Sequence, residues 1–152
     1  MEKVKKYIKA ILTPVIIGGI IGIIISPFID YSNLKKPLFS PPSIIFPIVW
    51  TILYILMGIS YGRLKSKKLI DSETKLIYYV QLGVNSLWSI FFFLIKWRLF
   101  SIIWIIILAI LIILMIFKFY KKDKIAGLIQ IPYLLWVIFA TYLNIAIYVL
   151  NK

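Results

Sequence analysis

The sequence predicts an all-α membrane protein, a bundle of five transmembrane helices joined by short loops, of which the first loop is rich in proline. Of the 152 residues, 62% are hydrophobic and 15% are charged, whereas a soluble domain carries about 25% charged residues. Five stretches lack Asp, Glu, Lys and Arg, and each has about the 20 residues that a helix needs to cross the hydrocarbon layer. Runs such as IIWIIILAILIILMIF show no period-2 alternation, which argues against the strands of a membrane β-barrel.

The five uncharged stretches set the approximate positions of the helices. They cover residues 10–29, 37–62, 76–95, 99–117 and 125–151. We therefore expect helices over residues 8–26, 43–65, 74–95, 99–119 and 125–150, in a single transmembrane domain that spans residues 1–152. The first stretch follows several lysines, as in a secretory signal peptide. Its apolar run is longer than a typical h-region and lacks an obvious A-x-A site, so we expect it to be a helix of the bundle.

The distribution of positive charge predicts the orientation of the chain. Most of the 18 Lys and Arg residues lie in the N-terminal tail, the second loop and the fourth loop, all on one side of the membrane. By the positive-inside rule this side, with the N-terminus, faces the cytoplasm, and the expected location is a bacterial cytoplasmic membrane. Because these cations cluster beside helix ends, we expect them to contact anionic lipid and not nucleic acid.

The first connection, residues 27–47, contains five prolines and should be stiff, because each proline restricts its own φ and the residue before it. We expect the second helix to begin at Pro42 or the next residue, and Pro47 to remove a hydrogen bond one turn into the helix. Two interpretations stay open. The connection is either a rigid turn that starts the helix, or a lid over a cavity, with Tyr31 and Phe39 as its apolar contacts.

Aromatic, amide and small residues share one face on each of three predicted helices. Their three- or four-residue spacing places them together in each case: Trp50, Tyr54 and Gly58; Gln81, Asn85, Trp88 and Ser89; and Pro132, Trp136, Ala140 and Asn144. One interpretation is structural, with Asn85 bonded to Asn144 or to backbone across a helix interface. The other is an aromatic-walled site between the three helices. We expect Trp97 to be an interfacial anchor instead.

Missing residue types exclude much chemistry. The chain has no Cys and no His, so it offers no thiol nucleophile, no imidazole base and no His-ligated metal, and we expect no metal site. The acidic residues all fall in predicted tails or loops: Glu2, Asp30, Asp71, Glu73 and Asp123. A proton relay or acid–base catalysis inside the membrane therefore has no residues to build it. A flat, largely apolar ligand suits the remaining side chains, and its carboxylates could reach Lys35 or Lys36 in the first loop.

Three segments carry specific motifs: KPLFSPPSIIFPIVWTILYILMGISYG, QLGVNSLWSIFFF and IPYLLWVIFATYLNIAIY. Within them the diagnostic residues are Pro41-Pro42, Trp50 and Leu53-Tyr54; Gln81, Asn85 and Trp88; and Pro132-Tyr133, Trp136, Ala140 and Leu143-Asn144. In these segments, nearly half of the chain, the sequence closely resembles the TspO/translocator protein family, also called tryptophan-rich sensory proteins or peripheral benzodiazepine receptors.

The resemblance implies a five-helix bundle, often a homodimer, with a pocket under the first loop that binds porphyrins such as protoporphyrin IX and haem, sterols, and benzodiazepine-type drugs. It also implies tetrapyrrole sensing and, in some bacterial members, light-dependent breakdown of protoporphyrin. The ligand-binding residues expected on this basis are Tyr31, Phe46, Trp50, Tyr54, Gln81, Asn85, Trp88, Trp136, Ala140 and Asn144. Trp50 and Trp136 would form the oxidisable pair, and so the catalytic residues, of porphyrin degradation.

Two features depart from or extend the family pattern. Many family members carry an Asp early in the fourth helix, whereas the matching stretch here, FSIIWIII, offers Trp104. Leu143, Tyr148 and Lys152 fit a sterol-contact pattern, but such patterns are weak, and we expect no sterol ligand. The third helix as a homodimer face rests on the family likeness alone, because Gly83 belongs to no small-xxx-small motif.

The leading hypothesis is a porphyrin-binding membrane receptor or sensor that requires no cofactor, with photochemical degradation as a secondary activity and no conventional enzyme chemistry. Because haem would lack an axial His or Cys, iron-free porphyrin, or haem held by stacking, is the expected ligand. Two alternatives stay open: a passive transporter of porphyrins or other small amphipathic molecules, and a membrane scaffold without a small ligand.

Overall fold

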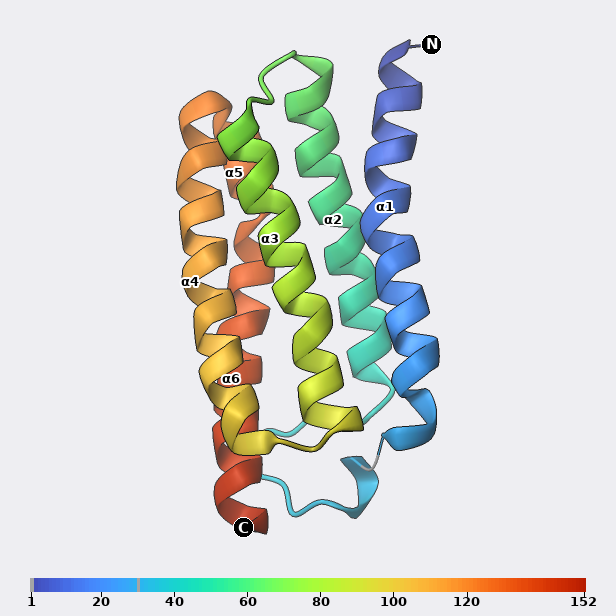
Figure 1. The fold of residues 1–152 in the computed structure, drawn as a ribbon, viewed down its shortest axis with the longest axis vertical. Coiled ribbons are helices and arrows are strands. Elements are labelled where there is room, and N and C mark those ends of the chain that lie inside the picture. The colour runs from blue at the N-terminus through green and yellow to red at the C-terminus, as the bar shows by residue number, and fades with distance from the viewer. Residues whose placement is uncertain (1, 30) are drawn as a thin grey trace.

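The computed structural model describes residues 2–29 and 31–152, so Asp30, which the sequence places in the first loop, lies outside the described residues. The long helices stand side by side, with the C-terminus and the first loop at the end opposite the N-terminus (Figure 1). Among the described residues, five helical segments are long and apolar enough to span a membrane, and no strand occurs. The expected all-α fold with five spanning segments is confirmed.

The helices in chain order are α1 (Glu2–Ile25), the 3-10 helices η1 (Ser26–Phe28) and η2 (Tyr31–Asn33), α2 (Ile45–Ser66), α3 (Ser72–Ser89), the π-helical turn η3 (Ile90–Leu94), α4 (Arg98–Lys122), α5 (Lys124–Ile129) and α6 (Ile131–Asn151). α1 begins at Glu2 and not at residue 8, because lysines are good helix formers and the apolar run marks only the part of the helix that enters the membrane. α3 begins at Ser72, where the carboxylate of Asp71 accepts a hydrogen bond from the Thr74 N–H at 2.8 Å. Glu73 therefore lies in a helix and not in a loop.

Two irregularities interrupt segments that the sequence predicted as continuous helices. The fifth segment divides at Gln130 into α5 and α6, because Pro132 near the start of α6 has no N–H for a regular helical bond. The third segment ends in η3, where the N–H of Ile95 donates to the carbonyl of Ile90 at 2.9 Å, five residues back. This wider turn brings Phe92 inward as a buried side chain.

The start of α2 differs from the expectation. α2 begins at Ile45, after turn bonds from the Ile45 N–H to the Pro42 carbonyl (3.0 Å) and from the Phe46 N–H to the Ser43 carbonyl (3.3 Å). Pro47 is thus the third helical residue, where an N–H would have no partner within the helix. The prediction that Pro47 removes a helical hydrogen bond is wrong, since the carbonyl it was expected to free accepts from Phe46.

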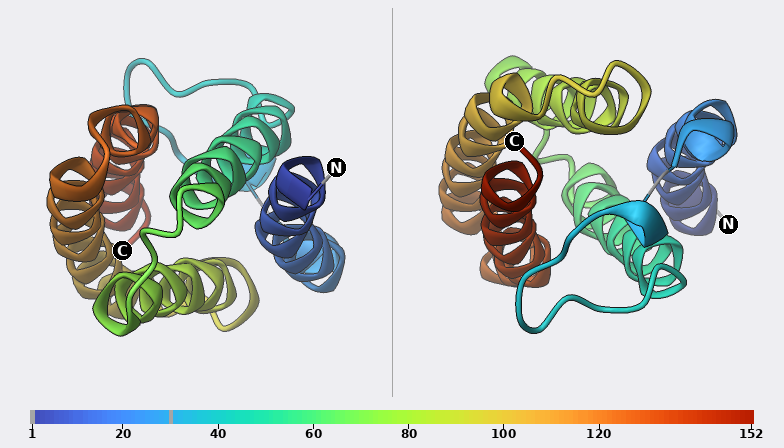
Figure 2. Two further views of the ribbon diagram at one scale, coloured as in Figure 1. Left: turned by 90° about the horizontal axis from the view of Figure 1, so that it is seen from above. Right: turned by 90° about the horizontal axis from the view of Figure 1, so that it is seen from below.

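The first loop, residues 26–44, crosses one end of the bundle from η2 to α6 and returns to α2 (Figure 2). It is tied to α6 at two points. The side-chain amide of Asn151 donates to the Lys35 carbonyl (2.8 Å) and accepts from the Lys35 N–H (3.0 Å). The hydroxyl of Tyr142 donates to the Leu38 carbonyl at 2.8 Å. These bonds fix the loop as a cover over the end of the bundle that we call the first-loop end.

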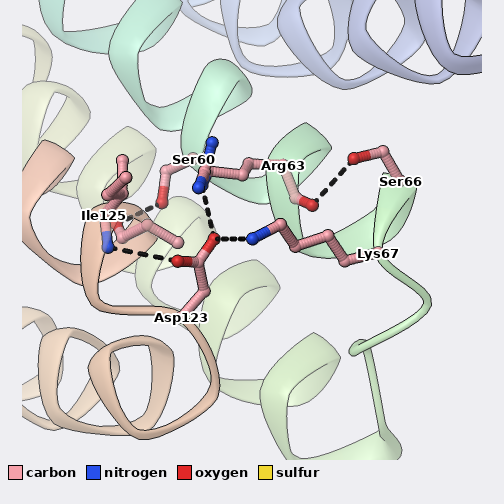
Figure 3. A network of polar contacts seen from close by, with 7 residues as sticks. Ser60, Arg63, Ser66, Lys67, Asp123 and Ile125 are labelled. Atoms are coloured by element: carbon pink, nitrogen blue, oxygen red, sulfur yellow. Dashed lines mark hydrogen bonds and ion pairs between the residues drawn. The ribbon is translucent and has the colours of Figure 1, made fainter.

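At the opposite, N-terminal end, a polar network joins α2 to the junction of α4 and α5 (Figure 3). The carboxylate of Asp123 pairs with Arg63 and lies 3.5 Å from the Lys67 amino group. It also caps α5 by accepting from the Ile125 N–H at 3.2 Å. Burial acts to raise the pKa of Asp123, but the bonds from Arg63 and Ile125 and the nearby charges outweigh it and hold the pKa below its usual value.

Candidate functional site

A cavity of about 570 Å³ lies in the first-loop half of the bundle. Its walls come from α1, α2, α6 and the α3–η3 segment, and the first loop covers its outer end. Three glycines and four aliphatic residues contribute the α1 wall, and aromatic rings contribute most of the rest. The principal lining residues are Gly18, Gly19 and Gly22; Tyr31; Phe46, Trp50 and Tyr54; Trp88, Phe92 and Phe93; and Trp136, Ala140 and Asn144.

The aromatic wall centres on Trp50, which α2 places one turn before Tyr54. The two rings stack with centroids 5.7 Å apart, and Trp50 meets Trp136 of α6 edge to face at 6.5 Å. Phe46 extends the wall toward the first loop. Its ring centroid lies 5.8 Å from that of Trp136 and 4.9 Å from that of Tyr31 in the loop. These separations and angles are those that aromatic side chains prefer. The rings therefore form one continuous surface from the loop into the bundle.

The α1 wall is shaped by small residues. A Cβ atom added to Gly18 would lie 2.3 Å from the ring of Tyr54, so this ring rests directly against the α1 backbone. A Cβ added to Gly19 or Gly22 would meet nothing within 4 Å. On the opposite side, Ala140 likewise presents only a methyl group to the cavity. The space exists because these positions have little or no side chain to fill it.

Two tryptophans of the cavity differ in how their indole N–H groups are used. Nε1 of Trp88 donates to Oδ1 of Asn144 at 3.0 Å, and Ser101 donates to the same oxygen at 3.2 Å. Nε1 of Trp136 is buried and has no hydrogen-bond partner among the described residues. An unpaired buried donor is costly, but this N–H is shielded from the cavity as well, so a ligand acceptor could reach it only if the Trp136 ring turned.

Gln81 and Asn85 were expected to bind ligand, but they do not line the cavity. Both are buried in a chain of hydrogen bonds on its N-terminal side. Tyr54 donates to Asn85 (2.9 Å), Asn85 donates to Tyr133 (2.7 Å), and Tyr133 donates to Gln81 (2.7 Å). This network forms a floor that fixes the hydroxyl of Tyr54. The suggested pairing of Asn85 with Asn144 is wrong, since each amide bonds to other partners.

The other expected ligand-binding residues all line the cavity: Tyr31, Phe46, Trp50, Tyr54, Trp88, Trp136, Ala140 and Asn144. Phe39 was expected to contact the cavity from the first loop, and this is wrong. Its side chain is 79% exposed, and its backbone adopts a φ of 70°, which turns the chain at the tip of the loop.

Sequence reasoning missed the α1 glycines, Phe92 and Phe93. The GGIIG run was the available signal for the glycines, but nothing in the sequence indicated the π turn that directs the phenylalanines.

The first loop carries a positive charge, Lys36, beside the cavity residue Tyr31. Nζ of Lys36 donates to the Tyr31 carbonyl at 3.0 Å and lies 4.8 Å from the centre of the Tyr31 ring. Burial raises the pKa of the Tyr31 phenol, although a hydrogen bond with Ser40 opposes this. The neutral phenol donates to the Pro41 carbonyl at 2.9 Å. Among the described residues no acidic side chain lines the cavity, and Lys36 is the cation that lies over the ring of its lining residue Tyr31.

Trp104 occupies the region where the family resemblance suggested an Asp. Its Nε1 donates to the Val84 carbonyl of α3 at 2.8 Å, and its ring packs on Phe91 and Phe100. It therefore joins α4 to the α3–η3 segment and does not line the cavity. Among the described residues, no group of three or more His, Cys, Asp or Glu is placed to hold a metal ion.

Comparison with known proteins gives consistent matches over most of the chain. The model of the TspO/MBR family matches residues 10–150. A tryptophan-rich protein TspO of Archaeoglobus fulgidus is 43% identical over 122 residues, which cover 80% of this chain and 79% of that protein. Protein CrtK of Rhodobacter capsulatus is 34% identical, covering 88% and 86% of the two chains. A tryptophan-rich sensory protein of Cereibacter sphaeroides is also 34% identical, covering 81% and 77%.

Proposed function

The chain belongs to the TspO/MBR family of integral membrane proteins, and we propose that it is a membrane sensor that binds a porphyrin, foremost iron-free protoporphyrin IX, in the cavity under the first loop. The observation that carries the proposal is the aromatic wall of a cavity of about 570 Å³. Pockets for small molecules have volumes of roughly 300 to 1,000 Å³ and are mostly apolar with a few placed polar groups. A flat macrocycle can stack on these rings, and Lys36, whose amino group lies over the ring of Tyr31, is a cation for its carboxylates.

The side chains favour the iron-free ligand over haem. The chain has no His and no Cys, and the oxygen donors nearest to an axial role would be the cavity tyrosines. Both phenols are already used as donors, Tyr31 to the Pro41 carbonyl and Tyr54 to Asn85. Haem would therefore be held by stacking alone.

A secondary light-dependent activity follows from the same wall. Trp50 and Trp136 lie 6.5 Å apart at the cavity surface, and indoles are the side chains here that most readily give an electron to an excited aromatic ligand. We propose that the excited porphyrin takes one electron from this pair and passes it to dioxygen, and that the superoxide formed adds to the macrocycle and opens it while the electron returns to the indole radical, so that dioxygen is the net oxidant. Loss of both indoles should abolish the degradation and leave part of the binding.

Sensing is favoured over passive transport by the floor of the cavity. The hydrogen-bonded chain from Tyr54 through Asn85 and Tyr133 to Gln81 is buried and separates the cavity from the N-terminal end. A carrier would have to break this chain to pass a ligand across the membrane. Efflux of preloaded porphyrin from proteoliposomes tests this point. Faster efflux than from protein-free liposomes with the same load would favour the carrier.

Titration with protoporphyrin IX while tryptophan fluorescence is followed tests the binding proposal. We expect saturable quenching, and about tenfold weaker binding in Trp50→Phe and in Trp136→Phe, because each loses part of a stacking surface. Trp97→Phe is the matched control, since Trp97 is 56% exposed and outside the cavity lining. Absence of saturable quenching would contradict the proposal and leave the scaffold as the better hypothesis.

The charge pattern supports an orientation with the N-terminus in the cytoplasm of a bacterial cell, and we retain it as part of the proposal. A homodimer also stays a prediction from the family likeness. Neither is needed for the cavity, which is built within one chain.

A further inference from the structure

We propose that the cavity receives its ligand sideways from the hydrocarbon layer, through a mouth between the first-loop halves of α1 and α2. The ligand class is then amphipathic molecules dissolved in the bilayer, and not molecules delivered from water through the first loop. This inference rests on the proposed function, because a route presupposes a ligand, but part of its test needs no ligand.

Some residues that line the cavity are also exposed, and they identify the mouth. On α1 these are Gly19, Gly22 and Ile23, on α2 they are Pro47 and Thr51, and in the first loop next to these helices they are Ser26, Ile29 and Ser43. Thr51 lies six residues after the start of α2 at Ile45, which is about 9 Å along the helix at 1.5 Å per residue. In a membrane-spanning helix this depth is inside the apolar layer, so the exposed cavity wall faces lipid.

The mouth exists because α1 and α2 separate toward the first-loop end. In the N-terminal half they touch backbone to backbone, since a Cβ on Gly58 would lie 2.3 Å from the Ile11 Cα. The contact of Gly18 with the Tyr54 ring is the last close approach that a glycine provides along α1. Beyond it the two helices diverge, and η2 lies between their ends (Figure 2).

Other ways into the cavity are closed by specific contacts. The first loop is tied to α6 through Asn151 and Tyr142, and within itself by the bond of Tyr31 to the Pro41 carbonyl. Toward the N-terminal end, the hydrogen-bonded floor blocks the passage. Between α2 and α6 the ring of Trp136 forms the wall, with a separate apolar groove behind it. Every exposed residue of the described lining lies on α1, on α2 or in the first loop beside them, and none lies on α3, η3 or α6.

Two glycines allow the mouth to be narrowed without disturbing the packing. A side chain added at Gly19 or Gly22 meets no atom within 4 Å at its Cβ, and it would stand where the ligand must pass. Gly83 on α3 is an equivalent position elsewhere. It is exposed, its added Cβ also meets nothing within 4 Å, and it is outside the cavity lining. Gly83→Leu therefore controls for the effect of a new leucine on the helix and on its contact with lipid.

The first experiment measures the rates of protoporphyrin IX binding and release in proteoliposomes, with the porphyrin supplied in the lipid. We expect Gly22→Leu to slow binding and to slow release by about tenfold, since a side chain at the mouth raises the barrier between cavity and lipid, whereas mere loss of cavity space would speed release. Gly19→Leu should act in the same direction, and Gly83→Leu should leave both rates unchanged. Unchanged rates in both mouth variants, or equal slowing in Gly83→Leu, would overturn the proposal.

The second experiment needs no porphyrin and uses the absence of cysteine from the chain. A nitroxide attached to Thr51→Cys in liposomes is tested for collision with dioxygen, which concentrates in hydrocarbon, and with a water-soluble nickel chelate. We expect strong relaxation by dioxygen and little by nickel. Strong relaxation by nickel would place water in the mouth, and weak relaxation by both would place protein over it; either result overturns the proposal. If porphyrin fails to bind but the nitroxide behaves as expected, the proposed function fails and the lipid-facing mouth stands.

Discussion

The N-terminal half and the first-loop half of the bundle use the same helices but pack them in different ways. In the N-terminal half Tyr61 stacks on Tyr78 with ring centroids 4.3 Å apart, and Tyr78 stacks in turn on Phe119 at 6.1 Å. Tyr78 and Phe119 are no more than 1% exposed. In the first-loop half Trp50 and Trp136 are 6.5 Å apart, and the space beside them remains a cavity.

Glycine illustrates the difference between the halves. Gly58 in the N-terminal half lets two helix backbones approach, and any Cβ there would clash with Ile11. Gly19 and Gly22 in the first-loop half approach nothing, and their missing side chains leave room. The same residue type therefore closes one half of the α1–α2 interface and hollows the other. Where the helices cross decides which effect a glycine has.

Gly58→Ala should cause the largest loss of stability, because it adds a side chain where α1 and α2 touch backbone to backbone. The added Cβ would lie 2.3 Å from the Cα of Ile11, and a backbone atom cannot move aside without shifting α1. We expect a loss of about 3 kcal/mol in the free energy of unfolding, measured by thermal unfolding in detergent micelles. Gly83→Ala, with no atom near its new Cβ, should be neutral or slightly stabilising. Equal stabilities of the two variants would show that the α1–α2 contact is not close.

Tyr133→Phe tests the floor that separates the two halves. It removes one hydroxyl, so Nδ2 of Asn85 and Oε1 of Gln81 lose their bonds to Tyr133, although Asn85 still accepts from Tyr54 and Gln81 still donates to the Tyr78 carbonyl. We expect a loss of about 2 kcal/mol in the free energy of unfolding. Tyr142→Phe, which loses only an exposed bond to the first loop, should cost less than about 1 kcal/mol. Similar losses in the two variants would contradict a buried network.

Asp123→Asn tests the polar network at the N-terminal end, where we expect a smaller loss of about 1 kcal/mol at neutral pH. The folded pKa of Asp123 lies below its usual value of 3.8, so its contribution to stability is full above about pH 4. It is lost as the pH falls through the folded pKa, when the carboxylate is protonated. The wild-type protein should therefore lose more stability between pH 5 and 3 than the variant, as measured by thermal unfolding. Parallel pH profiles would show that Arg63 and Lys67 do not stabilise the carboxylate.

The sequence predicted the spans and most of the cavity wall, and failed where backbone geometry decides. Periodicity places Trp50 with Tyr54, and Trp136 with Ala140, on shared helix faces, and burial in the bundle brings those faces together. The same periodicity put Asn85 on the face of Trp88, but Asn85 points to Tyr133 and not into the cavity. Position along the helix, and not the face alone, separates the floor from the wall.

Three other features were beyond sequence patterns for a physical reason. The π turn at Ile90–Leu94 changes the direction of every side chain in it, and no local residue preference marks it. Phe39 has a φ of 70° and is 79% exposed, although the interpretation of the first loop as a lid made it a contact of the cavity. The divergence of α1 from α2 depends on how two long helices cross.

Trp88→Phe and Trp136→Phe should change the stability least. Comparing them separates an indole whose N–H is hydrogen-bonded from one whose N–H has no partner among the described residues, both in the first-loop half. Trp88 loses a hydrogen bond to Asn144, worth about 0.6 kcal/mol between membrane helices. Trp136 loses an indole N–H that has no partner among the described residues, so its replacement removes a buried unpaired donor. We expect Trp88→Phe to lower the midpoint of thermal unfolding and Trp136→Phe to leave it unchanged or raise it slightly. The reverse order would mean that packing of the Trp136 indole contributes more to stability than its unpaired N–H costs.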